Sequence, residues 1–238
     1  MPAELTIVIP ARNEIQSLPK LLTSLNQQDY LHLPDTRVCV ADANSTDGTA
    51  EMARSFPARF PIEILPGGLP AVGRNAGARR AATPYVLFLD ADVELSDPTL
   101  LRRSVRAMQR HQLHCLTTNI RCIDGSVADR LLFGGSNVVQ KLSRWGLPFA
   151  TGMFMMFERQ EFQKLGGFNE QALYAEDYLL SKQVARKRFA VIPGTVMTSN
   201  RRLRKMGHLR IAGMFFLTAL NSGNQSYFLR DQGYWEES

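Results

Sequence analysis

The first half of the chain alternates short apolar runs with segments of helical periodicity. The apolar runs predict buried strands at 5–10, 37–41, 62–65 and 85–89. Apolar residues at helical spacing, together with capping residues, predict helices at 17–27, 46–56, 74–82 and 97–112. Such alternation is typical of parallel strands, because each helix returns the chain to the start of the next strand. The pattern therefore predicts an α/β fold with a mostly parallel central sheet flanked by helices.

The second half of the chain has a less regular pattern. Further strands are expected at 113–120, 154–157 and 189–192. Further helices are expected at 128–145, from Glu158 onward and at 176–186. The sequence contains no internal repeat, low-complexity tract or clear linker. One continuous domain over residues 1–238 is the simplest organisation.

Polar residues that can carry chemistry directly follow three of the predicted strands. Ala11-Arg12-Asn13-Glu14 follows the first strand, Asp42 the second, and Asp90-Ala91-Asp92 the fourth. Ligands of parallel sheets bind at the carboxyl ends of the strands. A pair of carboxylates there can hold Mg²⁺ or Mn²⁺, which keep water and ligand phosphates in their other positions. The sequence therefore indicates a metal site and an anionic ligand at this edge of the sheet.

Two neighbouring segments have a structural as well as a functional interpretation. Ser45-Thr46-Asp47 is typical of a helix cap, whereas Asp42 precedes the cap and is the better ligand candidate. The glycine-rich segment 67–77 leads into a helix, where Arg74 and the helix N-terminus favour a diphosphate. Its glycines fit a simple turn equally well, and the Lys-Ser/Thr ending of a P-loop is missing.

Composition and charge narrow the class of partner. Of the 238 residues, 45% are apolar and 21% are charged, which are ordinary globular values and argue against disorder. The net charge of +6 favours nucleic acid, phosphorylated ligands or an acidic membrane surface. Basic residues crowd into 201–210, for which a solvated helix face is an equal alternative.

Cysteine use and the apolar runs indicate a cytoplasmic protein. Cys39, Cys115 and Cys122 form no CxxC pair, which argues against a disulfide framework and a thiolate zinc site. No signal peptide is visible at the N-terminus. The apolar run 211–220 has about half of the ~20 residues that cross a bilayer. For the tail at 207–220, three alternatives stay open: a helix on the inner membrane surface, packing on the domain, or a dimer contact.

The order of the motifs resembles one enzyme family. IPARNE, DANSTDGT, GRNAGARRA and FLDADVEL are followed by Gly166-Gly167-Phe168 and then by Glu176-Asp177. This order, over about 5–202, is similar to that of the inverting GT-A glycosyltransferases called family two. The resemblance implies a nucleotide diphosphate sugar as donor, with uridine favoured, and Mg²⁺ or Mn²⁺ as cofactor. It implies a Rossmann-like nucleotide-sugar-binding half at 1–112, a smaller acceptor and catalytic half at 113–205, and a helical tail at 206–238.

The resemblance also implies roles for individual residues. The donor pocket is expected to be lined by Pro10, Ala11, Asn13, Glu14, Asp42, Arg74 and Asp90. Asp92 is expected to bind the metal, and Arg202 to stabilise the leaving diphosphate. Asp177, next to Glu176, is expected to be the catalytic base. Without the flanking motifs, this acidic pair would be read as complementing a helix dipole.

The chain departs from the family pattern at two points. Asp42-Ala43-Asn44-Ser45 stands where Asp-Asp-Gly-Ser is usual, which leaves uridine and guanosine both open. The Gln-x-x-Arg-Trp signature of processive polymer synthases is absent, which favours the transfer of a single sugar. The acceptor, whether lipid, glycan or small metabolite, is not identified.

Two other functions compete with sugar transfer. A nucleotidyltransferase usually has a glycine-rich, basic loop after the first strand, and IPARNE has no glycine. A non-catalytic nucleotide- or RNA-binding module would fit the basic charge. However, no aromatic residues are interleaved with the basic cluster, as stacking on single strands requires, so no nucleic-acid partner is expected.

Overall fold

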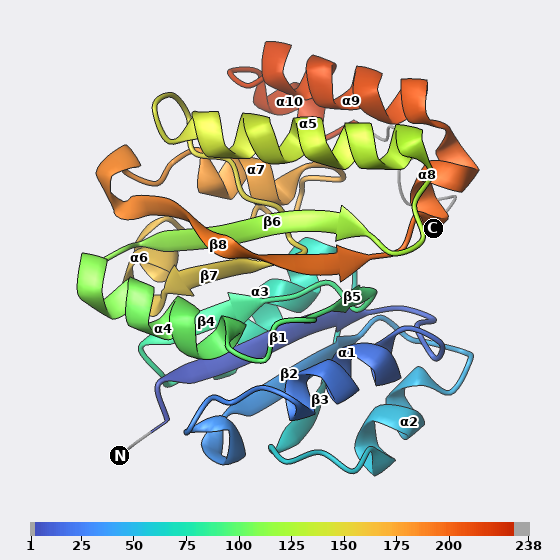
Figure 1. Ribbon diagram of the computed structural model, residues 1–238, viewed down its shortest axis with the longest axis vertical. Coiled ribbons are helices and arrows are strands. Elements are labelled where there is room, and N and C mark those ends of the chain that lie inside the picture. Colours follow the sequence, from blue (N-terminus) through green and yellow to red (C-terminus); the bar gives the residue numbers. More distant parts are fainter. Residues whose placement is uncertain (1–2, 231–238) are drawn as a thin grey trace.

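One eight-stranded sheet forms the centre of the protein in a computed structural model that describes residues 3–230, apart from the side chain of Gln225. Its strands are β1 (Leu5–Ala11), β2 (Arg37–Asp42), β3 (Ile62–Pro66), β4 (Tyr85–Phe88), β5 (Val93–Glu94), β6 (Cys115–Cys122), β7 (Met155–Glu158) and β8 (Phe189–Thr198). The strand order is β3-β2-β1-β4-β7-β6-β8-β5 (Figure 1). All strands run in one direction except β5 and β7. The predicted mostly parallel sheet is therefore confirmed.

Helices cover both faces of this sheet (Figure 1). They are α1 (Leu18–Asn26), α2 (Thr49–Ser55), α3 (Pro70–Arg80), α4 (Leu100–His111), α5 (Val127–Ser143), α6 (Arg159–Lys164), α7 (Glu176–Ser181), α8 (Arg201–Met206), α9 (His208–Leu220) and α10 (Gln225–Phe228), with 3-10 turns at Leu33–Asp35 and Arg186–Arg188. Ile7 and Ile9 of β1 pack in one core with α1 and α4, whereas Val8 packs in a second core with α3 and α6. This division follows from the alternation of side chains along a strand.

Several predicted helix boundaries are wrong, among them the start at 97, since that helix begins at Leu100. The helix predicted at 74–82 begins at Pro70, which suits the first helical position, so Arg74 lies in the second turn and not at the N-terminus. The helix predicted at 46–56 begins at Thr49, because Asp47 accepts hydrogen bonds from the Thr49 amide and hydroxyl. The helix predicted at 176–186 ends at Ser181.

A glycine sets the distance between α3 and the sheet. A Cβ atom on Gly77 would lie 2.3 Å from Cγ1 of Val8, closer than any side chain tolerates. The absence of a side chain lets α3 pack directly on β1. This close packing brings Arg74 of the same helix under the carboxyl ends of the strands.

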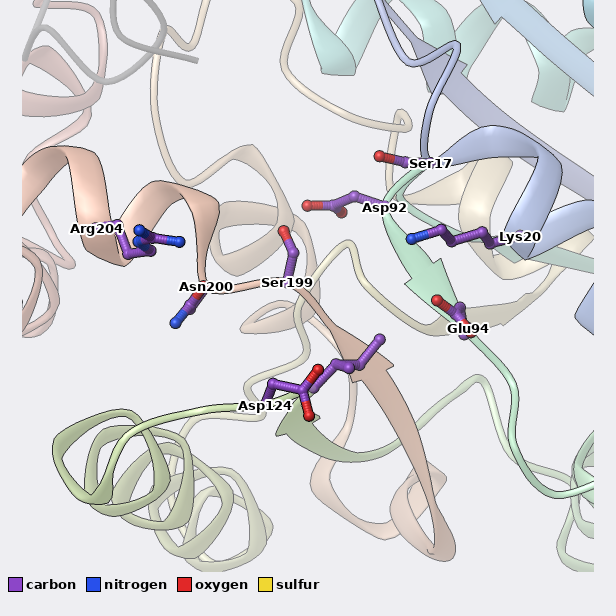
Figure 2. Close-up of a pocket in the computed structure, with 9 residues that line it drawn as sticks. Ser17, Lys20, Asp92, Glu94, Asp124, Ser199, Asn200 and Arg204 are labelled. Carbon is purple, nitrogen blue, oxygen red and sulfur yellow. The ribbon is translucent and has the colours of Figure 1, made fainter.

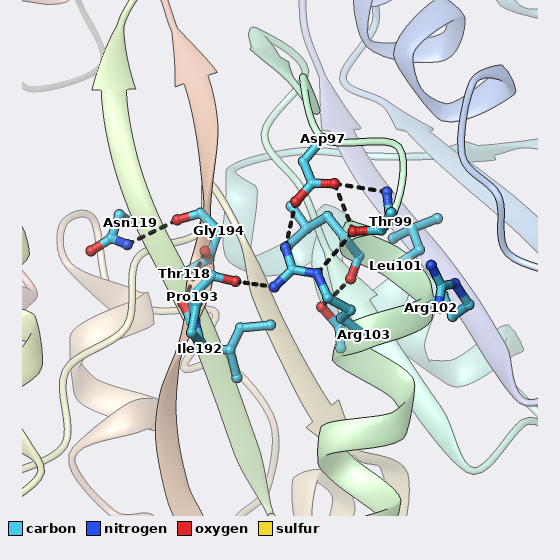
Figure 3. Close-up of polar contacts among 12 residues, drawn as sticks. Asp97, Thr99, Leu101, Arg102, Arg103, Thr118, Asn119, Ile192, Pro193 and Gly194 are labelled. Atoms are coloured by element: carbon cyan, nitrogen blue, oxygen red, sulfur yellow. Dashed lines mark hydrogen bonds and ion pairs between the residues drawn. The ribbon is translucent and has the colours of Figure 1, made fainter.

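Polar contacts hold β8 where it bends (Figure 3). The pairing of β6 with β8 shifts register between Thr118 and Asn119. Nδ2 of Asn119 donates to the carbonyl of Gly194 at 2.8 Å, and Nη1 of Arg103 on α4 donates to the carbonyl of Pro193 at 2.6 Å. These contacts satisfy backbone carbonyls that the irregular pairing leaves open. Beyond the bend, β8 continues to Thr198, well past the predicted end at 192.

Candidate active site

The carboxyl ends of the parallel strands gather the predicted site residues at one edge of the sheet. Asn13 and Glu14 follow β1, Asp42 ends β2, and Asp90 follows β4. The start of β7 reaches the same edge because β7 runs antiparallel to β4. The first and second halves of the chain therefore meet here, as the position of ligand sites in parallel sheets leads one to expect.

The loops after β1 and β2 are interlocked by hydrogen bonds. The amide of Asn13 donates to Oγ of Ser45 at 2.9 Å, and Oδ1 of Asn13 accepts from the amide of Thr46 at 2.9 Å. The amide of Glu14 donates to Oγ1 of Thr49 at 2.9 Å. Asn13 has a positive φ of 54°, a conformation that asparagine tolerates better than most residues. These contacts hold the loops after β1 and β2 in fixed positions relative to each other.

Asp42 has one carboxylate oxygen to which no described protein group donates a hydrogen bond. Its Oδ2 accepts a hydrogen bond from the amide of Ser45 at 3.1 Å. Its Oδ1 is buried and has no hydrogen-bond partner within residues 3–230. Buried carboxylate oxygens rarely stay unpaired, so this atom is an acceptor open to a donor group of a ligand.

Arg74 joins the two halves of the site. It is only 3% exposed, and its Nη2 donates to Oδ1 of Asp90 at 2.6 Å, while its Nη1 donates to Oε1 of Glu176. Its guanidinium also lies over the ring of Phe168, 5.3 Å from the centroid. Burial lowers the pKa of Arg74, but Asp90 and Glu176 raise it, and the net direction is upward. Arg74 is therefore fixed as a cation that holds two carboxylates in place.

Asp177 lies beside this cluster, with its carboxyl group held by two backbone amides. Its Oδ2 accepts from the amide of Gly152 at 2.9 Å and its Oδ1 from the amide of Tyr178 at 2.7 Å. Burial and the neighbouring Glu176 raise the pKa of Asp177 to about 7, although Arg74 and the two amides oppose this rise. A carboxyl group with such a pKa can accept a proton near neutral pH.

A loop glycine makes this arrangement possible. A Cβ atom on Gly152 would lie 2.0 Å from Nη2 of Arg74 and 3.2 Å from Oδ1 of Asp90. Only a residue without a side chain lets the loop before β7 pass so close to the guanidinium while its amide contacts Asp177. No pattern in the sequence pointed to Gly152.

Asp92 lies in a cavity of about 330 Å³ next to the cluster (Figure 2). The cavity is lined by Ser17, Lys20, Asp92, Glu94, Ile123, Asp124, Ser199, Asn200 and Arg204. Burial and the nearby carboxylates of Asp90 and Glu14 raise the pKa of Asp92 to about 6, whereas Arg202 and Arg201 lower it. Asp92 is thus a crowded carboxylate near two arginines at the start of α8.

Glu14 and Arg201 connect the first strand to this basic segment. Nη2 of Arg201 lies 2.5 Å from Oε1 of Glu14, and Nη1 lies 3.3 Å from Oε2. Such a two-point contact fixes the orientation of the guanidinium. Of the cavity residues, Lys20, Glu94 and Asp124 were not among the sequence candidates. Asp124 lies two residues after the end of β6, so a correct end for that strand would have indicated it by the rule that ligand residues follow strand ends.

The carboxylates fit a cation that a ligand helps to bind. Within residues 3–230, no cluster of three or more histidine, cysteine or acidic residues has the arrangement of a metal cage. Asp90 already forms an ion pair with Arg74, whereas Asp92 forms none with the residues at 3–230. Mg²⁺ commonly binds through one or two carboxylates together with substrate phosphates, and the donor set here suits that mode.

Sequence comparison assigns most of the chain to one family model. The model described as glycosyl transferase family 2 matches residues 6–166. The 4,4'-diaponeurosporenoate glycosyltransferase of Staphylococcus haemolyticus is 34% identical over 113 residues, which are 45% of this chain and 29% of that protein. The chain thus aligns with less than a third of the length of this relative.

Two solved structures share the fold. The mannosyltransferase of Pyrobaculum calidifontis, in complex with GDP-mannose and Mn²⁺, superposes with a TM-score of 0.70 at 20% identity, covering 91% of this chain and 65% of that one. TarS of Staphylococcus aureus, in complex with UDP-GlcNAc, superposes with a TM-score of 0.64 at 19% identity, covering 81% of this chain and 58% of that one. At these identities the likeness establishes the fold, which is that of glycosyltransferases.

Proposed function

The chain belongs to glycosyl transferase family 2, and from this premise we propose that it moves one sugar from a nucleoside diphosphate sugar to an acceptor hydroxyl, with inversion at the anomeric carbon. The single observation that supports this best is the placement of Asp177. It lies beside the Arg74 cluster, at the sheet edge where Asp42 and Asp92 lie. A candidate proton acceptor thus lies in the same site as candidate contacts for the phosphates and for the nucleobase.

The donor nucleotide is proposed to bind across the ends of β1 and β2. Pro10, Ala11, Asn13 and Glu14 line this region, and the unpaired Oδ1 of Asp42 accepts the ring N–H of the base. Uracil and guanine both carry such a donor, and the solved neighbours bind GDP-mannose and UDP-GlcNAc respectively. We favour a UDP-sugar, on the resemblance of the motifs.

The leaving diphosphate is proposed to bind between Asp92 and α8. Asp92 holds Mg²⁺ or Mn²⁺ together with the diphosphate; when bound, this cation neutralises charge that builds on the leaving group. Arg202 at the start of α8 faces the same charge, and its field reaches Asp92. Cations placed where negative charge develops stabilise the transition state.

Asp177 is proposed to act as the general base. It takes the proton of the acceptor hydroxyl while that oxygen forms a bond to the anomeric carbon, and the bond from that carbon to the diphosphate oxygen breaks with its electron pair. Well-placed acid–base catalysis of this kind contributes roughly 10²–10⁴-fold. Because attack comes from the side opposite the leaving group, the configuration inverts.

Arg74 is proposed to organise the site and not to bind the donor directly. The sequence comparison with the family implies that Arg74 faces the donor. A side chain that is 3% exposed and contacts two carboxylates has little surface left for a diphosphate. Its effect on the donor would instead pass through Asp90, which we place near the ribose.

Two substitutions separate donor binding from turnover. Asp92→Ala should abolish metal-dependent binding of the donor, because the cation loses its protein carboxylate. Asp177→Asn should keep donor binding and lose turnover, because an amide does not accept the proton. The matched control is Asp35→Asn, an exposed carboxylate on the turn at Leu33–Asp35. Normal sugar transfer by Asp177→Asn would reject the assignment of the base.

A thermal-shift screen of nucleotides and nucleotide sugars with Mn²⁺ identifies the donor. A ligand that binds the folded state alone raises the unfolding temperature. We expect UDP-sugars to stabilise the protein more than GDP-sugars, and Asp42→Asn to weaken stabilisation by both, because either base would donate its ring N–H to this carboxylate. Stabilisation by nucleoside triphosphates alone, with release of pyrophosphate, would instead support a nucleotidyltransferase. The acceptor is proposed to be a lipid or a glycan.

A further inference from the structure

Helix α5 turns its apolar side outward. Val127, Leu131, Val138 and Leu142 follow the spacing i, i+4, i+11 and i+15, which places them on one face of the helix. All four are exposed, Leu131 to 72%. The opposite face turns inward and holds the partly buried Leu132 and Phe133 together with polar Gln140, which is fully enclosed and whose Nε2 donates to Oγ1 of Thr117 at 2.9 Å. A surface helix in a protein surrounded by water usually turns polar residues outward, which this stripe of α5 does not.

Helix α9 has an outward apolar face as well as an inward one. Ile211, Met214 and Thr218 are buried against the rest of the domain. On the opposite side, Leu209, Phe216 and Leu220 follow the spacing i, i+7 and i+11 and are exposed, Leu209 to 90%. Packing within the domain therefore uses only one side of this helix.

The two helices lie side by side at one end of the molecule (Figure 1). Leu132 and Phe133 of α5 pack in the same cluster as Ile211 and Met214 of α9. Of the exposed large apolar side chains within residues 3–230, all but Leu31 fall in 127–147 or 209–229. Monomeric soluble proteins rarely gather so many exposed apolar side chains in one region, and such gatherings mark interaction surfaces.

The exposed charged side chains of α5, α8 and α9 are all basic. Helices α5, α8 and α9 contain a single acidic residue, Asp129, which is buried. The same three helices carry seven basic residues: Arg130, Lys141, Arg201, Arg202, Arg204, Lys205 and Arg210. Exposed Trp145 follows α5, with the guanidinium of Arg144 lying 5.3 Å from its ring centroid. Apolar residues with a tryptophan and basic side chains are typical of a face that enters the headgroup region of a bilayer.

We propose that the outward faces of α5 and α9 dock the protein on an anionic lipid bilayer. The apolar stripes enter the interface, and exposed basic residues outside the candidate site, such as Arg130, Lys141 and Lys205, bind anionic headgroups. Arg201, Arg202 and Arg204 instead belong to that site. The protein lies on the surface and does not cross it, because no helix within residues 3–230 combines the length and hydropathy of a membrane span. The sequence left a membrane contact of α9 open among three alternatives; α5 had no such assignment.

Charge favours a bilayer over a second copy of the chain. A twofold contact would place these basic helices against one another, and like charges in an interface disfavour association. An anionic surface instead complements them. The docking face is also joined to the candidate site, since α8 carries Arg201 at one end and leads through Gly207 into α9.

Vesicle flotation tests the proposal without any donor or acceptor, so its result is independent of the proposed transfer activity. The protein should float with vesicles of equimolar phosphatidylcholine and phosphatidylglycerol, and far less with pure phosphatidylcholine. Added salt should weaken the binding, because it screens the basic residues. The variant Leu131→Gln/Phe216→Gln should bind at least about tenfold more weakly, since it removes two large apolar side chains from the interface.

Leu31→Gln is the matched control, because Leu31 is 78% exposed and lies outside both regions. This control should bind vesicles as the parent does, and both variants should keep the parental unfolding temperature, since they change exposed side chains. The proposal is overturned if the parent protein does not float, or if Leu131→Gln/Phe216→Gln floats as well as the parent. It is also overturned if the parent is a dimer in solution that this double variant converts to a monomer, which would assign the face to a second copy.

Discussion

At the scale of single residues, one buried arginine links the carboxylates of the candidate site. Arg74 contacts Asp90 and Glu176, and Glu176 precedes Asp177 in the chain. Removing one partner from a buried ion pair leaves an uncompensated charge, which typically costs about 3–5 kcal/mol. The positions of these carboxylates are therefore interdependent, and a change at one should be visible in the titration of another.

The pH dependence of turnover should report on Asp177. Its pKa is raised to about 7, and a base acts only when ionised, so kcat/KM should rise with pH through this region. Glu176→Gln removes a negative neighbour and should move the acidic limb to lower pH, because the ionised form of Asp177 becomes less costly. The measurement is the pH profile of kcat/KM, with exposed Glu51→Gln as the control. An acidic limb that stays in place in Glu176→Gln would contradict this coupling.

A pair of glycine substitutions should have opposite effects on stability. Gly152→Ala places a Cβ atom against Arg74 and should lower the free energy of unfolding by about 1–3 kcal/mol, as overpacking does, with a loss of turnover. Gly134→Ala in α5 meets no atom within 4 Å and should stabilise the protein by about 1 kcal/mol through helix propensity. Denaturant unfolding measures both. Parental stability of Gly152→Ala would mean that the loop at Gly152 moves aside without cost.

At the scale of helices and strands, three helices meet at one buried carboxylate. Asp129 forms a capping box with Ser126 at the start of α5. It also accepts from Nδ2 of Asn200 at 3.1 Å and lies 2.7 Å from Nε2 of His208, the first residue of α9. These hydrogen bonds, foremost that from Asn200, lower the pKa of Asp129. The orientation of α8, which carries Arg201 and Arg202, therefore depends on a residue of α5.

Asp129→Ala should loosen α8 and α9 as well as α5. Ser126→Ala removes only a helix cap and should cost about 1 kcal/mol. Asp129→Ala also releases Asn200 and His208, so its unfolding temperature should fall further, and limited proteolysis should cut near 199–208. Because the lowered pKa of Asp129 stabilises the folded state only while the carboxylate is ionised, this difference should shrink in acid below about pH 4. Equal melting of the two variants at neutral pH would show that Asp129 acts only as a cap.

The sheet unites both halves of the chain at the scale of the whole molecule. The antiparallel pairing of β4 with β7 joins the first four strands to the rest, and β5, from the first half, pairs with β8. The proposed donor would contact both halves, at Asp42 and at Arg202. Ligand binding should therefore raise the stability of the whole domain.

Removal of the metal should cancel stabilisation by the donor. A donor at about 100 times its Kd stabilises the folded state by about 2.7 kcal/mol. We expect a rise in unfolding temperature with UDP-sugar and Mn²⁺, and its loss when a chelator is added. A shift that persists with the chelator would show that the donor binds without a cation.

The sequence by itself determined the sheet, its direction and the strand ends at which the predicted site residues lie. Strand and helix periodicities are local, so they are readable without a structure, and polar residues after 5–10, 37–41 and 85–89 were placed at one edge from pattern alone. Strand β5 was not predicted, because its two residues are too few for a period to appear.

The tertiary structure decided the contacts between residues far apart in the chain. Arg74 and Glu176 are 102 residues apart, and nothing in either segment specifies their partner. The requirement for glycine at 152 becomes apparent only from the guanidinium of Arg74 beside it. The helical pattern at 128–145 likewise predicted α5 but not which side it buries. That choice depends on packing, because Asp129 and Gln140 find polar partners inside the fold beside Leu132 and Phe133, and one apolar stripe of the helix is left facing outward.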